Sequence, residues 1–190
     1  LEIRVAGLLQ LLKSGANPSR PDGLSPLEQL KKIEVKTRKM VSDQYRCWNE
    51  ELLPALADEG IYIWESQKLT KSHVEYVKSY WEEQLEPVLT PIVIDPAHPF
   101  PSVINKALCI GTLLKSKNTV LMGVSTVPRV LPRLVKLPDI GGEQHFVSLA
   151  GIMDLMVDKL FRGYKTIASA PFRVTRNSDL YLNEEDADNI

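Results

Sequence analysis

Residues 107–127 read "ALCIGTLL", "KSKN" and "TVLMGVSTV", two apolar runs separated by four polar residues. Each run has the length of a strand, and the polar residues between them have the length of a hairpin turn. We therefore expect an antiparallel pair of strands at this point of the chain.

Further short apolar runs lie on both sides of this hairpin. We expect strands at "IYIW" (61–64), "IVI" (92–94), "RLVKL" (133–137), "HFVSL" (145–149) and "TIASAPFRVTR" (166–176). One long helix is expected between Thr70, as its cap, and Pro87, and another over 150–161, closed by Gly163. Runs of strands with a few helices between them predict an α+β fold with a mostly antiparallel sheet.

The first 59 residues have a different, helical character. A short amphipathic helix is expected to end near Gly15, and a proline-rich loop follows it. "SPLE" (25–28) then combines a serine cap, a proline at the first helical position and a glutamate that can bond back to the cap. Apolar residues recur at spacings of three and four from Leu27 to Leu56, which predicts a helix of ~30 residues with a kink at Pro54. We expect an antiparallel helical hairpin, a partial bundle, over residues 1–59 and the sheet domain over residues 60–190.

The composition is that of an ordinary globular protein, with 44% hydrophobic and 25% charged residues and a net charge of -1. Charge-driven binding therefore has to come from local patches. The longest apolar runs are far short of the ~20 residues that a membrane span requires. Cys47 and Cys109 stand far apart among apolar residues, which favours two buried free thiols over a disulfide. Both ends of the sequence look cut, so we expect a part of a longer protein.

No motif for a catalytic site is present in the sequence. It lacks the glycine loops that bind phosphates, the nucleophile elbow and the zinc-protease motif. His73 stands in the first turn of a helix and is expected to be solvated, whereas His145 lies beside a strand, where a structural role is favoured over a catalytic one. His98 stands between Pro96 and Pro99 in "IDPAHPFP", which predicts a stiff corner and leaves a ligand contact open.

Positive charge is the remaining polar theme. "KKIEVKTRK" places Lys32, Lys36 and Lys39 on one face of the long helix. In the second half, residues 128–176 contain eight Lys or Arg against four Asp or Glu. Both regions have two interpretations. One is an ordinary solvated surface, and the other is a binding surface for a polyanion.

Four arginines are the candidate phosphate contacts, because a guanidinium group can bind a phosphate through two hydrogen bonds. They are Arg129, Arg133, Arg173 and Arg176. Alternate residues of a strand point to opposite faces, so Arg173 and Arg176 can share a phosphate only if the strand ends between them.

Six segments, taken in order, resemble one family, the histidine-phosphorylating polyphosphate kinases of bacteria. These segments are "EIRVAGL" (2–8), "DGLSPLEQL" (22–30), "LTPIVIDPAHPFP" (89–101), "VPRVLPRLVKLP" (127–138), "HFVSLAGIMDLMVDKLFRGY" (145–164) and "FRVTRNSDL" (172–180). The resemblance spans nearly the whole chain. It implies that residues 1–59 are the C-terminal part of the family's helical N-terminal domain and that residues 60–190 are its head domain, truncated at the C-terminal end.

The resemblance also implies an activity for the longer protein. This activity is the reversible transfer of the terminal phosphate of ATP to polyphosphate through a phosphohistidine, with Mg²⁺, in the bacterial cytoplasm or at its membrane. Such a transfer requires positioning and positive charge above all, which a basic tunnel provides. The implied partners are polyphosphate and further copies of the chain, in a dimer or tetramer built through the head domain. Nucleic acid is not an expected partner, and membrane association is expected to be peripheral at most.

The family's phosphohistidine lies in an "HLGTGN"-like motif that this sequence lacks. The family's nucleotide and magnesium contacts fall outside these residues as well, so no catalytic, cofactor-binding or metal-binding residue can be assigned here. We expect the chain to be inactive alone and to provide scaffold, oligomer contacts and part of the tunnel wall. The alternatives are a non-catalytic polyanion-binding module and a purely structural interaction domain. The salt dependence of binding distinguishes these two alternatives, because the affinity for a polyanion bound through its phosphates falls steeply as the salt concentration rises.

Overall fold

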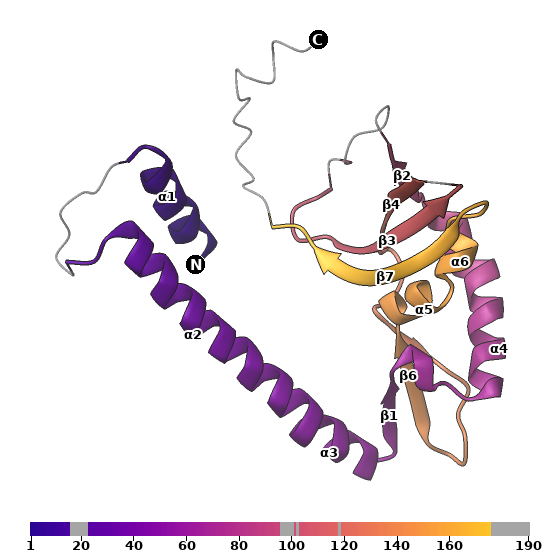
Figure 1. Cartoon of the computed structure of the whole chain (residues 1–190). Coiled ribbons are helices and arrows are strands. Elements are labelled where there is room, and N and C mark those ends of the chain that lie inside the picture. Colours follow the sequence, from indigo (N-terminus) through magenta and orange to yellow (C-terminus); the bar gives the residue numbers. More distant parts are fainter. Residues whose placement is uncertain (16–22, 96–100, 102, 118, 176–190) are drawn as a thin grey trace. The chain divides into compact units, whose positions relative to one another are not determined.

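The computed structural model describes residues 1–15, 23–95, 101, 103–117 and 119–175 (Figure 1). It divides into two compact units, Leu1–Ala55 and Leu56–Ile190. The first is helical and contains α1 (Glu2–Lys13), α2 (Pro26–Arg46), η1 (Cys47–Leu52) and the start of α3 (Leu53–Asp58). α1 packs against α2, and the second unit combines helices with strands. The expected α+β class is therefore confirmed.

α2 begins where the sequence predicts. The hydroxyl of Ser25 accepts a hydrogen bond from the Glu28 N–H at 3.3 Å, and the Glu28 carboxylate accepts one from the Ser25 N–H at 2.8 Å. The hydrogen bond from the Ser25 hydroxyl is the main cause that lowers the pKa of Glu28. Pro26 takes the first helical position, where no N–H is needed. Four consecutive residues thus fix the start of the helix.

Two prolines widen the helices that precede them. The pattern W-x-E-x-L-x-P occurs at 48–54 and again at 81–87. In each copy the tryptophan carbonyl accepts from the N–H five residues later, from Leu53 after η1 and from Glu86 after η3 (Trp81–Leu85). A proline ring clashes with the carbonyl four residues before it, and a wider π turn relieves that clash. The kink expected at Pro54 is therefore a π segment.

The second unit contains two sheets. Its elements are β1 (Ile61–Trp64), η2 (Ser66–Lys68), α4 (Lys71–Tyr80), η3, η4 (Glu86–Val88), β2 (Ile92–Ile94), β3 (Leu108–Ser116), β4 (Thr119–Thr126), β5 (Leu134–Lys136), β6 (Gln144–Ser148), α5 (Leu149–Leu155), α6 (Val157–Leu160) and β7 (Lys165–Arg173). The strand orders are β1-β6-β5 and β2-β4-β3-β7. β1 and β6 pair in parallel, and the other pairs of these strands are antiparallel. The mostly antiparallel arrangement is as expected.

The hairpin predicted over residues 107–127 is present. β3 and β4 pair from Cys109↔Thr126 to Ser116↔Thr119. β7 lies on the other side of β3 as an edge strand, where Pro171 is tolerated because no neighbour needs its missing N–H.

The main core forms where α4, α5 and α6 pack with the strands (Figure 1). Its largest members are Trp81 and Phe161, both buried. The single helix expected over 150–161 is divided instead, because Met156 leaves helical geometry at φ -102° and ψ 16°. Lys159 pairs with Glu82 at 2.8 Å, which attaches the C-terminal part of this helical segment to the helix that starts at α4.

Candidate functional site

Arg173 is the last residue of β7, so the strand ends between Arg173 and Arg176, as a shared phosphate would require. Its guanidinium donates from Nη1 to the carbonyl of Lys106 at 3.2 Å, and the Lys106 N–H donates to the carbonyl of Val174 at 2.9 Å. The side chain is exposed. A strand end and a turn therefore hold Arg173 in place, and among the described residues the other N–H groups of its fork have no partner and can bind an anion. Arg176 lies outside the described residues.

Arg129 and Arg133 lie in the segment that joins β4 to β5. Thr126 pairs with Cys109 and Leu108 pairs with Arg173, so β4 and β7 end at the same end of the sheet. Both arginines are exposed, and within the described residues neither forms an ion pair.

The structure brings these arginines only partly together. Arg129 follows β4 at the end of the sheet where Arg173 lies, whereas the carbonyl of Arg133 accepts from the Leu149 N–H at 2.9 Å, at the start of α5. In the described part of the chain, no hydrogen bond or ion pair joins any two of them. Exposed guanidinium groups can bind phosphate oxygens, but nothing in this arrangement forms or breaks a bond.

Two histidines form a buried aromatic cluster with Trp64. His73 is 0% exposed and His145 is 4% exposed, so the expectation that His73 is solvated is wrong. Its helix presents it to β6, and the two imidazole rings lie 5.1 Å apart. The indole of Trp64 donates from Nε1 to Nδ1 of His145 at 2.9 Å. This cluster supports the structural role expected for His145.

The partners of the two imidazoles decide where their protons lie. Because Nδ1 of His145 accepts from Trp64, its proton is on Nε2. Nε2 of His73 lies 3.2 Å from the carbonyl of Pro138, which can only accept, so the proton of His73 is also on Nε2. The other two ring nitrogens, the donor Nε2 of His145 and the acceptor Nδ1 of His73, are buried without a hydrogen-bond partner in the described part of the chain. His73 is completely buried and His145 is 4% exposed, so neither ring is placed to accept a phosphate.

The described residues contain no group of three or more His, Cys, Asp or Glu side chains that could hold a metal ion. His98 lies outside the described residues. Both cysteines are free as expected, with Cys109 buried and Cys47 only half-buried. The donor set in the described part of the chain therefore does not fit the Mg²⁺ site that the resemblance implies for the longer protein.

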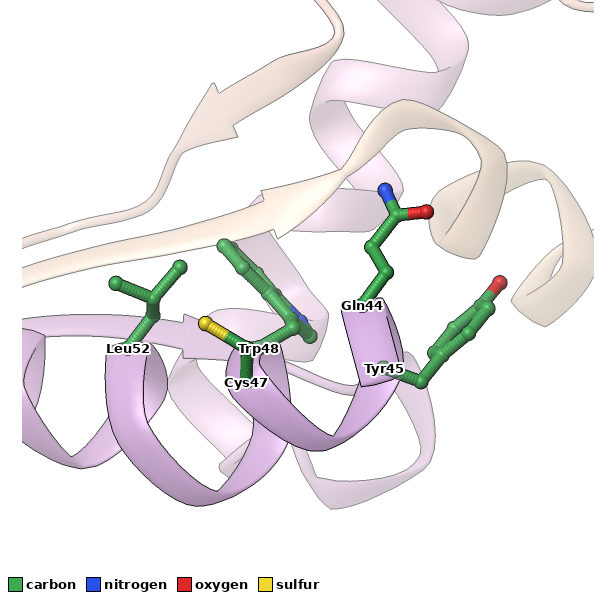
Figure 2. A pocket seen from close by; sticks show the side chains of 5 residues that line it. All are labelled: Gln44, Tyr45, Cys47, Trp48 and Leu52. Atoms are coloured by element: carbon green, nitrogen blue, oxygen red, sulfur yellow. The ribbon is translucent and has the colours of Figure 1, made fainter. Parts of the chain in front are cut away.

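The helical unit carries an apolar pocket of ≈ 370 Å³, lined by Gln44, Tyr45, Cys47, Trp48 and Leu52 (Figure 2). All five side chains come from one stretch of helix, at the junction of α2 and η1. No histidine or carboxylate lines this pocket, so Cys47 lacks a base to activate it. The pocket is an apolar surface and not a catalytic centre.

A second hollow, of ≈ 320 Å³, lies on the four-stranded sheet between β3, β4 and β7. Leu113 and Met122 pair across β3 and β4 and are exposed there, with Leu113 45% exposed. The hydrophobic alternation of "ALCIGTLL" predicts strands, but it does not distinguish this apolar outer face from the inner one.

Comparisons with known proteins cover almost all of this chain. The model of the polyphosphate kinase N-terminal domain matches residues 1–64, and that of the polyphosphate kinase middle domain matches residues 72–190. The chain belongs to the polyphosphate kinase family.

Among the relatives of this polyphosphate kinase family chain is the polyphosphate kinase of Bacillus anthracis, 39% identical over 192 residues, which cover 97% of this chain and 27% of the relative. That of Burkholderia multivorans is 36% identical over 195 residues, with 100% of this chain and 28% of the relative covered. The crystal structure of polyphosphate kinase from Porphyromonas gingivalis shares the fold, with a TM-score of 0.80 and 23% identity over 96% of this chain and 27% of that one. The chain thus spans about a quarter of the length of these relatives. No helix in its described part has the length and apolar character needed to cross a membrane.

Proposed function

We propose that the protein containing this chain transfers the terminal phosphate of ATP, reversibly and with Mg²⁺, to polyphosphate through a phosphohistidine. The single observation that carries this proposal is the match of two consecutive polyphosphate kinase domains along the chain. The relatives named above carry the same name as those domains. ATP, Mg²⁺ and the phosphohistidine are assigned to residues outside this chain, whose described part contains no group of three or more side chains that could hold a metal ion.

The chain itself provides scaffold and surfaces in this proposal, and it is inactive alone. Residues 1–59 are the C-terminal part of the helical N-terminal domain, and residues 60–190 are the head domain. The buried imidazoles of His73 and His145 support the assignment of phosphate transfer elsewhere, because a phosphorylated nitrogen has to be reached by the donor. The protein acts in the bacterial cytoplasm, with peripheral membrane contact at most.

The head domain contributes two surfaces. The exposed arginines Arg129, Arg133 and Arg173, with Arg176 after them, lie on the path of the polyphosphate chain. The apolar face around Leu113 and Met122 contacts a second copy, in a dimer or tetramer, because apolar patches of this kind on a soluble protein mark contact sites.

The test is a titration of the 190-residue chain with polyphosphate of medium length, at low and at high salt. We expect salt-sensitive binding, and we expect Arg129→Ala with Arg173→Ala to weaken it about threefold to tenfold, as for two exposed charge contacts. The control variant is Arg38→Ala with Arg46→Ala, which removes two arginines that already pair with Glu34 and Asp43. If the first variant keeps its fold by circular dichroism and its affinity for polyphosphate is unchanged, these arginines do not lie on the path of the polyphosphate chain.

A further inference from the structure

Four lysines of α2 surround one valine on the surface of the helical unit. Lys31, Lys32, Lys36 and Lys39, with Val35, line a hollow of ≈ 450 Å³ to which no carboxylate contributes. We call these five residues the lysine face.

The lysine face carries an excess of positive charge over the carboxylates near it. Lys39 pairs with Asp43 at 2.8 Å, whereas the other three lysines form no ion pair in the part of the chain that the structure describes. Glu28, one turn before the face, is held in the capping box by Ser25. Asp43, one turn after it, binds Arg46 as well as Lys39. Both carboxylates keep their negative charge, and the charges of Lys32 and Lys31 help to lower the pKa of Glu28. The four lysines of the face still outnumber these two carboxylates.

The lysine face lies opposite the apolar stripe of the same helix. At 100° per residue, Lys32, Lys36 and Lys39 fall on one side, and Leu30, Val41 and Trp48 fall on the other. α1 packs against α2, and Arg4 of α1 donates to Gln29 at 2.6 Å. All five residues of the lysine face are exposed.

We propose that the lysine face binds inorganic polyphosphate, through residues other than the arginines proposed above. The proposal rests on the proposed function, which supplies the polymer. Lys32, Lys36 and Lys39 follow one another at about 6 Å and about 4.5 Å along the helix axis, so they present a row of ammonium groups to a linear chain that carries a charge on every phosphate. Lysine suits this task because it acts as a mobile point charge and needs no fixed orientation of the phosphate.

The residues of the face favour polyphosphate over other polyanions. Single-stranded nucleic acid binds through aromatic side chains that stack on its bases, and the lysine face has none. The lysine face itself offers a membrane one apolar residue to bury, Val35. A polymer of phosphates without bases or tails requires only the cations.

The experiment compares two charge-matched variants of the 190-residue chain in a polyphosphate titration at low salt. Lys32→Gln with Lys36→Gln removes the centre of the face and keeps good helix formers. Lys71→Gln with Lys78→Gln removes the same charge from exposed positions of α4. We expect the first variant to bind about threefold to tenfold more weakly and to lose part of the salt dependence, and the second to bind like the parent chain. Acetylation mapped by mass spectrometry should show Lys32 and Lys36 protected by polyphosphate.

The outcomes separate this inference from the proposed function. If polyphosphate binds the chain but both variants bind equally well and Lys32 and Lys36 stay reactive, the lysine face is not a site, and the proposed function stands. If polyphosphate binds the chain nowhere, the lysine face and the arginine path are both wrong, and the chain keeps only its roles as scaffold and oligomer contact. Stronger protection of these lysines by an oligonucleotide or by anionic vesicles than by polyphosphate would also overturn the inference, in favour of that other ligand.

Discussion

Tyr62 shows how one neighbouring carboxylate controls the titration of a side chain. Its hydroxyl donates to Glu143 at 3.2 Å, and the negative charge of Glu143 is the main cause that raises the pKa of Tyr62. We expect Glu143→Gln to return this pKa toward the ordinary value of about 10. Tyrosinate absorbance, followed from neutral to alkaline pH, measures the change.

The sign of the linked stability follows from the same contact. Because the pKa of Tyr62 is higher in the folded chain than in the unfolded one, the contact stabilises the fold below pH ~10, and this contribution disappears as pH rises through the folded pKa. Tyr62→Phe is the control, since it removes the shifted group from the absorbance curve. Identical curves for the parent chain and Glu143→Gln would contradict the assignment.

Sequence reasoning at this scale identifies residue types but not their surroundings. The expectation for His73 failed because a position in the first turn of a helix does not tell which face of that helix is covered, and here β6 covers it. The arginines were predicted as exposed charges and are exposed where the structure describes them. Their separation along the sheet end and the start of α5 depends on strand register and loop path, which no local pattern contains.

The two copies of W-x-E-x-L-x-P give a matched comparison between elements. Trp81 is 0% exposed in the core of the second unit, and Trp48 is 38% exposed on the helical unit. We expect Trp81→Ala to lower the free energy of unfolding by about 3–5 kcal/mol, because it leaves a large cavity. Trp48→Ala is expected to cost less than about 1 kcal/mol in this chain. Urea unfolding followed by circular dichroism measures both.

Trp81→Phe is the control for the loss of ring volume. It keeps an aromatic ring and removes the indole N–H, which is buried without a partner in the described part of the chain, so it is expected to cost less than Trp81→Ala. Equal losses for Trp48→Ala and Trp81→Ala would show that burial does not distinguish the two copies.

Elements were predictable from sequence where a few adjacent residues specify them. The capping box at Ser25, the cap at Thr70 and the β3–β4 hairpin are each specified within a short segment, and all three are present. The parallel pairing of β1 with β6 was not foreseen, because nothing in "IYIW" identifies a partner so far along the chain. The break at Met156 was missed for the same reason, since the apolar pattern runs through it without interruption.

At the scale of the whole molecule, the apolar face around Leu113 predicts self-association. We expect Leu113→Glu to weaken the association between copies at least tenfold, because it places a charge in an interface that excludes water. Sedimentation of the 190-residue chain over a range of concentrations measures this. The prediction rests on the proposal that the head domain contacts a second copy.

Val130→Glu is the matched control for this variant. Val130 is still more exposed than Leu113, but it does not line the hollow on the sheet. Association that weakens equally in both variants would point to net charge as the cause, and association that persists in Leu113→Glu would exclude this face.

The parallel pair β1–β6 has a consequence for synthesis on the ribosome. Tyr62 pairs with His145, so β1 emerges from the exit tunnel about eighty residues before its partner. At about 5–20 residues per second, this corresponds to a wait of roughly 4 to 16 seconds with "IYIW" unpaired. Exposed apolar strand edges of this kind attract chaperones and other nascent chains. Translation speed between residues 64 and 144 therefore sets how long this vulnerable state lasts.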